Sequence, residues 1–251
     1  MLKTILAFGI LGLAGPCFAQ KKQVLIVTYA QGYKHESIAN AEIALKQVAK
    51  EDRRFEVSFC RTAPQVKAMM SPSALKRYDA VVFANTTGEL GTPDMDHFLR
   101  WIRGGKAFIG MHSATATGQE GDPRYHEMVG ALFKVHGNQA DGILHIDRPT
   151  HPAAAGLKSG QKLFEEYYHF TDPAHLIRKR ATVLASLKVQ PLDALGGAGK
   201  PKDMPMAWVR RYGQGRVFYT ALGHQTWIWD SAWYRQHIKG GIQWALNLPP
   251  R

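Results

Sequence analysis

Three histidines in this sequence come just after apolar runs that have the length of buried strands. They are His35 after residues 24–29, His112 after residues 106–111, and His224 after residues 217–221. In open parallel sheets, ligands bind beyond the carboxyl ends of the strands, so side chains that follow several strands can meet there. Imidazole acts as a general base, a general acid or a metal ligand. These three histidines are therefore the first candidates for a functional site.

A second group of polar residues has the sequence Glu165-Glu166-Tyr167-Tyr168-His169. Two acids beside two tyrosines and a histidine can supply a carboxylate ligand or a general acid, with aromatic rings that stack on sugar faces. A strand with one polar face would explain the same residues without any function. Of the two acids, we expect Glu166 to act with the histidines, either as a ligand or as an acid.

Further polar and aromatic residues follow the same runs and could contact a substrate. Asn85 and Thr86 come directly after residues 79–84 and would hold sugar hydroxyl groups, whereas Trp227 could either line a pocket or cap the sheet. The expected substrate contacts are Tyr33, Asn85, Thr86, Tyr168, Gln225 and Trp227.

Several other kinds of chemistry lack their sequence signals. No Ser-His-Asp or Cys-His arrangement occurs at a strand-to-helix turn, and the spacing of Gly110 and Gly118 does not fit a phosphate-binding loop. Cys60 ends a predicted strand without a basic turn beside it, which favours a structural thiol over a nucleophile.

The 251-residue chain has a formal net charge of +12, but its basic residues are scattered in pairs such as Lys21-Lys22 and Arg210-Arg211. No helix face collects them with interleaved aromatic residues, so we expect no nucleic-acid partner. The sequence leaves the oligomeric state open, a homo-oligomer included.

The first 19 residues have the pattern of a secretory signal peptide. Lys3 provides a positive start, an apolar stretch follows, and a small-residue cleavage site ends at Ala19. Cleavage there would leave an exported, periplasmic protein without a membrane span, although an uncleaved anchor is an alternative. It would also leave Cys60 alone, so the mature chain could form no internal disulfide.

Strands and helices alternate through the first half of the remaining chain. This pattern predicts an α/β fold with an open, mostly parallel sheet of the flavodoxin or glutamine amidotransferase kind, with helices on both faces. Residues 20–251 are expected to form a single domain. The expected strands are 24–29, 55–59, 79–84, 106–111, 142–147, 163–170 and 182–189, with a hairpin of 206–212 and 216–221. The expected helices are 37–48, 93–103 and 234–246, and residues 190–205 are expected to form a loop.

Taken together, these stretches resemble the trehalose-utilisation (ThuA-like) family over residues 24 to 246. The matching stretches are Gly32-Tyr33-Lys34-His35, Asn85-Thr86-Thr87-Gly88, Gly110-Met111-His112-Ser113-Ala114, His151-Pro152, Glu166-Tyr167-Tyr168-His169-Phe170, Met206-Ala207-Trp208, Gly215 to His224, Arg235-Gln236-His237 and Gly240-Gly241-Ile242. The family is similar in fold to class I glutamine amidotransferases, whose catalytic cysteine occupies the position of His112. The resemblance therefore does not imply Cys-dependent amidotransferase activity.

The resemblance implies catabolism of trehalose and related disaccharides, in particular of 3-keto sugars. Such a substrate favours an isomerase, lyase or hydrolase that works by proton transfer, because a ketone acidifies the neighbouring C–H groups. His35, His112, His224 and Glu166 would be catalytic, and the histidines could hold a divalent metal such as zinc or manganese. The alternatives are a non-catalytic periplasmic sugar-binding protein and a hydrolase of ordinary glycosides. The hydrolase would draw its two carboxylates from Glu89, Glu165 and Glu166.

Overall fold

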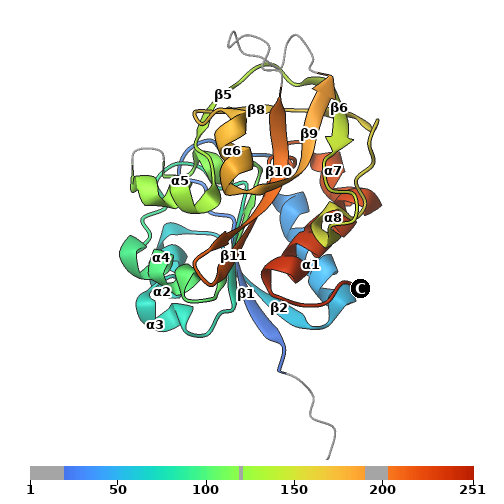
Figure 1. Cartoon of the computed structure of the whole chain (residues 1–251). Coiled ribbons are helices and arrows are strands. Elements are labelled where there is room, and N and C mark those ends of the chain that lie inside the picture. Colours follow the sequence, from blue (N-terminus) through green and yellow to red (C-terminus); the bar gives the residue numbers. More distant parts are fainter. Residues whose placement is uncertain (1–19, 119–120, 190–202) are drawn as a thin grey trace, which may run out of the picture.

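The apolar runs of the sequence form one large sheet in the computed structural model, which describes residues 20–118, 121–189 and 203–251 (Figure 1). The predicted leader, residues 1–19, and most of the predicted loop 190–205 lie outside the described residues. No helix in the described ranges is long and apolar enough to cross a membrane.

Within the described residues, nine strands form a large sheet and two form a small one. The strands are β1 (Lys22–Val27), β2 (Phe55–Cys60), β3 (Ala80–Ala84), β4 (Ala107–Met111), β5 (Phe133–His136), β6 (Ala140–Ile146), β7 (Lys162–Glu165), β8 (Tyr168–Phe170), β9 (Thr182–Val189), β10 (Met204–Tyr212) and β11 (Gly215–Thr220). The large sheet has the order β2-β1-β3-β4-β11-β10-β9-β6-β7, and β5 pairs with β8. From β2 to β11 neighbouring strands are parallel, and from β11 to β7 they are antiparallel.

Helices cover both faces of the sheet, as the alternating pattern predicts. The helices are α1 (Ile38–Asp52), α2 (Ala63–Met69), α3 (Pro72–Leu75), α4 (Met95–Arg103), α5 (Pro123–Val129), α6 (Ala174–Arg180), α7 (Thr226–Asp230) and α8 (Ala232–Ala245). Helices α1, α7 and α8 pack together on one face, and α3, α4 and α5 lie on the other (Figure 1). The predicted α/β class is confirmed.

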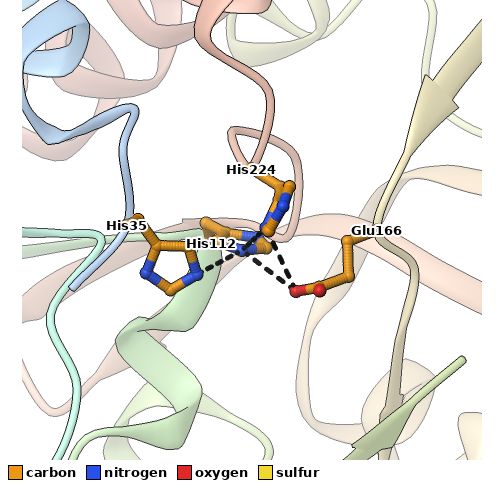
Figure 2. Close-up of side chains that lie close together, drawn as sticks. All are labelled: His35, His112, Glu166 and His224. Carbon is orange, nitrogen blue, oxygen red and sulfur yellow. Dashed lines mark hydrogen bonds and ion pairs between the residues drawn. The ribbon is translucent and has the colours of Figure 1, made fainter. Parts of the chain in front are cut away.

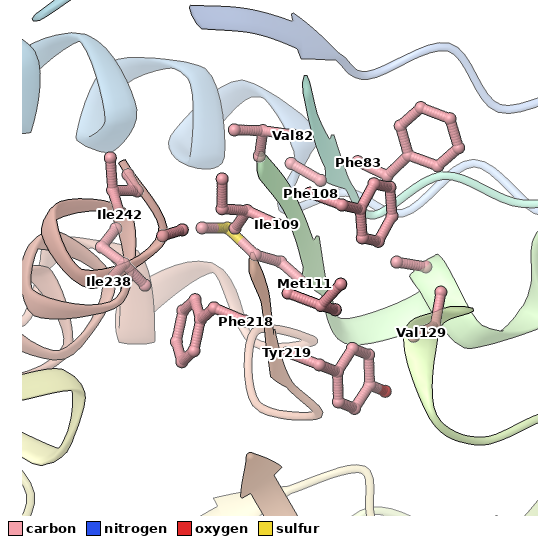
Figure 3. Packing of buried hydrophobic residues seen from close by; sticks show 14 of the residues in the cluster. Val82, Phe83, Phe108, Ile109, Met111, Val129, Phe218, Tyr219, Ile238 and Ile242 are labelled. Atoms are coloured by element: carbon pink, nitrogen blue, oxygen red, sulfur yellow. The ribbon is translucent and has the colours of Figure 1, made fainter. Parts of the chain in front are cut away.

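Alternating side chains of the central strands build a core on each face of the sheet. Phe108 of β4 contacts Phe83 of β3 and Tyr125 of α5 on one face. On the opposite face, Phe218 of β11 lies near Ile238 and Ile242 of α8 (Figure 3).

Close packing of α8 against the sheet and against residues 152–154 depends on two glycines. A Cβ atom at Gly241 would lie 2.1 Å from Cε1 of Phe218, and one at Gly240 would lie 2.1 Å from the carbonyl oxygen of Pro152. The pair Gly240-Gly241 therefore sets how closely α8 packs.

The structure differs from the sequence-based expectation in one segment that matters for function. Residues 163–170 were expected to form one strand, but β7 ends at Glu165 and β8 begins at Tyr168 in the other sheet. The Tyr167 side chain fills the space over Gly142, where a Cβ would lie 2.6 Å from its hydroxyl oxygen. The chain turns there, and the turn carries Glu166.

A candidate metal centre at the carboxyl ends of the strands

His112 occupies the sharp turn that leaves β4. Its backbone φ is 49°, a left-handed conformation that few residues other than glycine adopt, and its side chain is fully buried. The Tyr219 hydroxyl donates to the His112 carbonyl at 2.7 Å, and the ring Nδ1 lies 2.9 Å from the Ala221 carbonyl oxygen. A carbonyl can only accept, so Nδ1 carries the proton and a neutral ring keeps its lone pair on Nε2.

Four side chains surround that Nε2 atom, and Figure 2 shows three of them, His35, His224 and Glu166, with His112. The His112 Nε2 atom lies 3.1 Å from Nε2 of His35 and 3.3 Å from Nδ1 of His224. Oε2 of Glu166 lies 3.4 Å from His112 Nε2 and 3.3 Å from His224 Nδ1. The Tyr168 hydroxyl is 3.0 Å from the same His112 atom.

The geometry of these donors fits a divalent cation. One potential ligand atom from each of His35, His112, Glu166 and His224 lies within 4.8 Å of the others. Two ligands of a tetrahedral zinc ion lie about 3.3–3.4 Å apart when the bonds are about 2.0–2.1 Å long. A single lone pair on His112 Nε2 can accept one good hydrogen bond, yet three potential donors and a carboxylate surround it. A cation bound by the three histidines and Glu166 would explain why these groups lie so close together.

Neighbouring groups orient two members of the set. Nε2 of His224 lies 2.7 Å from the side-chain amide of Gln139, which also accepts a hydrogen bond from Gln225 at 2.6 Å. The other carboxylate oxygen of Glu166 lies 3.2 Å from Nδ1 of His136. His35 is held differently, because its buried Nδ1 has no hydrogen-bond partner among the described residues and its ring makes an edge contact with Tyr33.

Burial and mutual charge shift the pKa values of the cluster in different directions. Burial, together with the imidazoles of His112 and His224, lowers the pKa of His35 to about 3. Burial alone would raise the pKa of Glu166, but hydrogen bonds and charge from His112 and His224, when these rings are protonated, hold that pKa well below its usual range. Burial would lower the pKa of His224, but Glu166 outweighs it and raises that pKa. At neutral pH the site therefore offers a neutral His35 imidazole and an ionised Glu166.

Three members of the cluster, His35, Glu166 and His224, line a cavity of 630 Å³, a size suited to a small ligand, and His112 is buried behind them. The lining residues are Gln31, Gly32, Tyr33, His35, Thr87, Gly88, Glu89, Ser113, Ala116, Phe133, His136, Gln139, Glu166, Tyr168 and His224. Tyr33, Phe133 and Tyr168 supply rings, and the glutamines supply amides. Burial raises the pKa of Tyr168 well above its ordinary value, so its hydroxyl stays protonated and can donate.

The structure places the other predicted substrate contacts in different settings. Asn85 and Thr86 are fully buried and do not line the cavity. The Asn85 amide donates to Ser37 and to the Gly223 carbonyl, and Thr86 bonds to Thr117. These contacts stabilise the turns around the site.

Gln225 and Trp227 also lie outside the cavity lining. Gln225 reaches the site through Gln139, and the Trp227 side chain is 42% exposed on α7. Of the six expected contacts, Tyr33 and Tyr168 line the cavity.

Two residues at the site did not stand out in the sequence. His136 ends β5, and Gln139 lies in the connection between β5 and β6. Glu165, which the sequence did mark as a possible carboxylate of the site, is instead fully buried. Burial raises the pKa of this carboxyl group.

The fold and the site together define a class of protein. It is an α/β protein with a cluster of histidines and a carboxylate beyond the carboxyl ends of its parallel strands. The family model for trehalose utilisation (ThuA) matches residues 23–245, and the chain belongs to this family. No curated protein matched the chain in the sequence comparison.

Solved structures share the fold. A ThuA-like protein from Bacteroides uniformis is 18% identical, with 93% of this chain and 95% of that chain covered and a TM-score of 0.71. A ThuA-like protein from Parabacteroides merdae is 18% identical, with 90% of each chain covered and a TM-score of 0.67. A β-galactosidase from Rahnella sp. R3 is 13% identical, with 92% of this chain but 32% of that chain covered and a TM-score of 0.56.

Proposed function

We propose that this chain is an exported enzyme that modifies keto-sugars by proton transfer at a divalent metal centre. The observation that carries the proposal is the convergence of His35, His112, His224 and Glu166 beside a cavity that three of them line. The trehalose-utilisation family supports a carbohydrate substrate, and the sequence pattern of residues 1–19 supports export. Zinc and manganese suit a set of imidazoles and one carboxylate.

A ketone in a sugar ring makes the hydrogens on the neighbouring carbons acidic. Removing one of them requires a base nearby and a positive charge or hydrogen-bond donor at the carbonyl oxygen. When bound, a divalent cation supplies a charge that polarises the carbonyl group. The three histidines and Glu166 hold it, and His112 is kept in the required tautomer by the Ala221 carbonyl.

Two cavity residues outside the donor set can hold or move a proton. The Tyr168 hydroxyl is 3.0 Å from His112 Nε2, and His136 Nδ1 is 3.2 Å from a Glu166 oxygen. Both side chains line the cavity, so a bound sugar would contact them. The rings of Tyr33 and Phe133 offer apolar surfaces for the C–H faces of the sugar.

The structure also bears on the two alternatives. A glycoside hydrolase needs two carboxylates that face each other across the substrate. Glu165 is buried beneath the site and does not line the cavity, which leaves Glu89 and Glu166 for such a pair. A sugar-binding protein would use the same rings and amides, so it must be separated from an enzyme by experiment.

Hydrogen exchange of a keto-sugar provides that experiment. In D₂O, protein loaded with zinc or manganese should exchange the hydrogens next to the keto group of a 3-keto-glucoside for deuterium, as followed by ¹H NMR. Chelation should stop the exchange, and the same metal without protein serves as the control. Saturable binding of the keto-sugar with neither exchange nor product would contradict the proposed enzyme and favour a binding protein.

A further inference from the structure

Glu165 joins the backbone of two residues of the proposed metal centre. Its side chain is fully buried at the end of β7. One carboxylate oxygen accepts the backbone N–H groups of Gly223 at 2.8 Å and of His224 at 3.0 Å. The other oxygen accepts the N–H of Glu166 at 2.8 Å. All three partners are therefore backbone N–H groups. Two of them belong to Glu166 and His224, which are residues of the proposed metal centre.

The two segments that Glu165 joins leave distant strands of the sheet. Glu166 follows β7 at the edge, whereas Gly223 and His224 follow β11 near the centre, and β10, β9 and β6 lie between. Direct strand pairing therefore does not fix the distance between Glu166 and His224. The carboxylate of Glu165 spans this gap.

The Gly223 peptide is held from its other side as well. Its carbonyl oxygen accepts hydrogen bonds from Ser37 at 3.1 Å, Asn85 at 3.0 Å and Trp229 at 2.9 Å. Its φ of 126° is a conformation that suits glycine, and a Cβ there would lie 2.9 Å from Trp229 and from Tyr234. With the carbonyl fixed by these donors, the N–H groups of the turn point at Glu165.

We propose that Glu165 is a positioning residue, which holds the backbones of His224 and Glu166 at the separation that metal binding needs. The inference rests on the proposed metal centre and adds a residue that does not itself touch the metal. A buried carboxylate is costly unless it is well hydrogen-bonded, and the three N–H donors supply those hydrogen bonds. Residues that orient metal ligands typically change metal affinity by about 10- to 100-fold when they are replaced.

Glu165→Gln is the sharpest substitution, because it preserves shape but turns one acceptor oxygen into an NH₂ donor. That NH₂ must face either Glu166 N–H or the N–H groups of Gly223 and His224, so at least one bond is lost. The matched control is Asp52→Asn. Asp52 is also a buried carboxylate, but its partners Arg54 and Gln243 belong neither to the proposed metal centre nor to the cavity lining.

Two measurements on the chain of residues 20–251 test the positioning role of Glu165. Amide hydrogen exchange should become faster in Glu165→Gln at Glu166, Gly223 and His224, but not in Asp52→Asn. Zinc affinity, measured by competition with a chelating dye, should fall about 10- to 100-fold in Glu165→Gln and change less than about twofold in the control.

The outcomes separate this inference from the proposed function. Unchanged exchange at these amides would overturn the positioning role, and so would unchanged zinc affinity in a Glu165→Gln protein whose parent binds zinc. If the parent chain binds no zinc or manganese, the metal centre is overturned, while faster exchange at the three amides would still support Glu165 as the residue that holds the two segments.

Discussion

Replacing His112 with alanine is expected to abolish metal binding and the exchange of keto-sugar hydrogens. Nε2 of His112 is the common neighbour of His35, His224 and Glu166. The substitution therefore removes the central ligand of the proposed metal centre. Replacing residues that merely orient ligands lowers metal affinity by about 10- to 100-fold, and loss of a ligand should lower it by more than about 100-fold.

The measurement is the metal content and exchange rate of His112→Ala beside those of His237→Ala. His237 is also fully buried and bonds to a backbone carbonyl, but its ring packs against Phe218 and Tyr234. The control therefore loses a buried imidazole without touching the site. Parental metal content and exchange in His112→Ala would show that His112 is neither a ligand nor a catalytic group.

Replacing Glu166 with glutamine is expected to have the second largest effect. The substitution keeps the shape of the side chain but removes the negative charge that faces His112, His224 and His136. A cation held by three neutral imidazoles would then lack its one anionic ligand. We expect zinc affinity to fall by about 100-fold or more, and keto-sugar exchange to fall with it.

Zinc titration and the deuterium assay test this result, with Asp52→Asn as the control for loss of a buried carboxylate. Comparing the loss of exchange activity with the loss of zinc affinity shows whether Glu166 acts through the metal. If Glu166→Gln lost exchange activity but bound zinc as tightly as the parent, Glu166 would act on the substrate and the proposed ligand set would be wrong.

The positions of the three histidines could be predicted because each follows a strand. His35 follows β1, His112 follows β4 and His224 follows β11, and these parallel strands end at the same edge of the sheet. The apolar runs that make the strands are buried on both faces, which makes them easy to recognise in a sequence.

The rest of the site depends on features that local sequence does not reveal. Asn85 also follows a strand, but its amide turns toward Ser37 and Gly223 instead of the cavity. Gln139 reaches His224 from an irregular connection, where no periodic pattern marks which side chain points inward.

The break between β7 and β8 and the short helices were missed for a similar reason. A run that ends in one sheet and resumes in another looks like a single strand, although Glu165 and Tyr168 belong to different sheets. Helices α2, α3, α5, α6 and α7 span seven residues or fewer, so their apolar periodicity is too short to recognise.

The metal content of purified protein comprising residues 20–251 tests the central claim most directly. Elemental analysis before and after chelation, and again after soaking in zinc or manganese, would count the ions held by each chain. The proposed centre predicts close to one divalent ion for each chain, lost on chelation and regained on soaking. A chain that stays metal-free after soaking would contradict the claim, and the histidines would then be acid–base groups or sugar contacts.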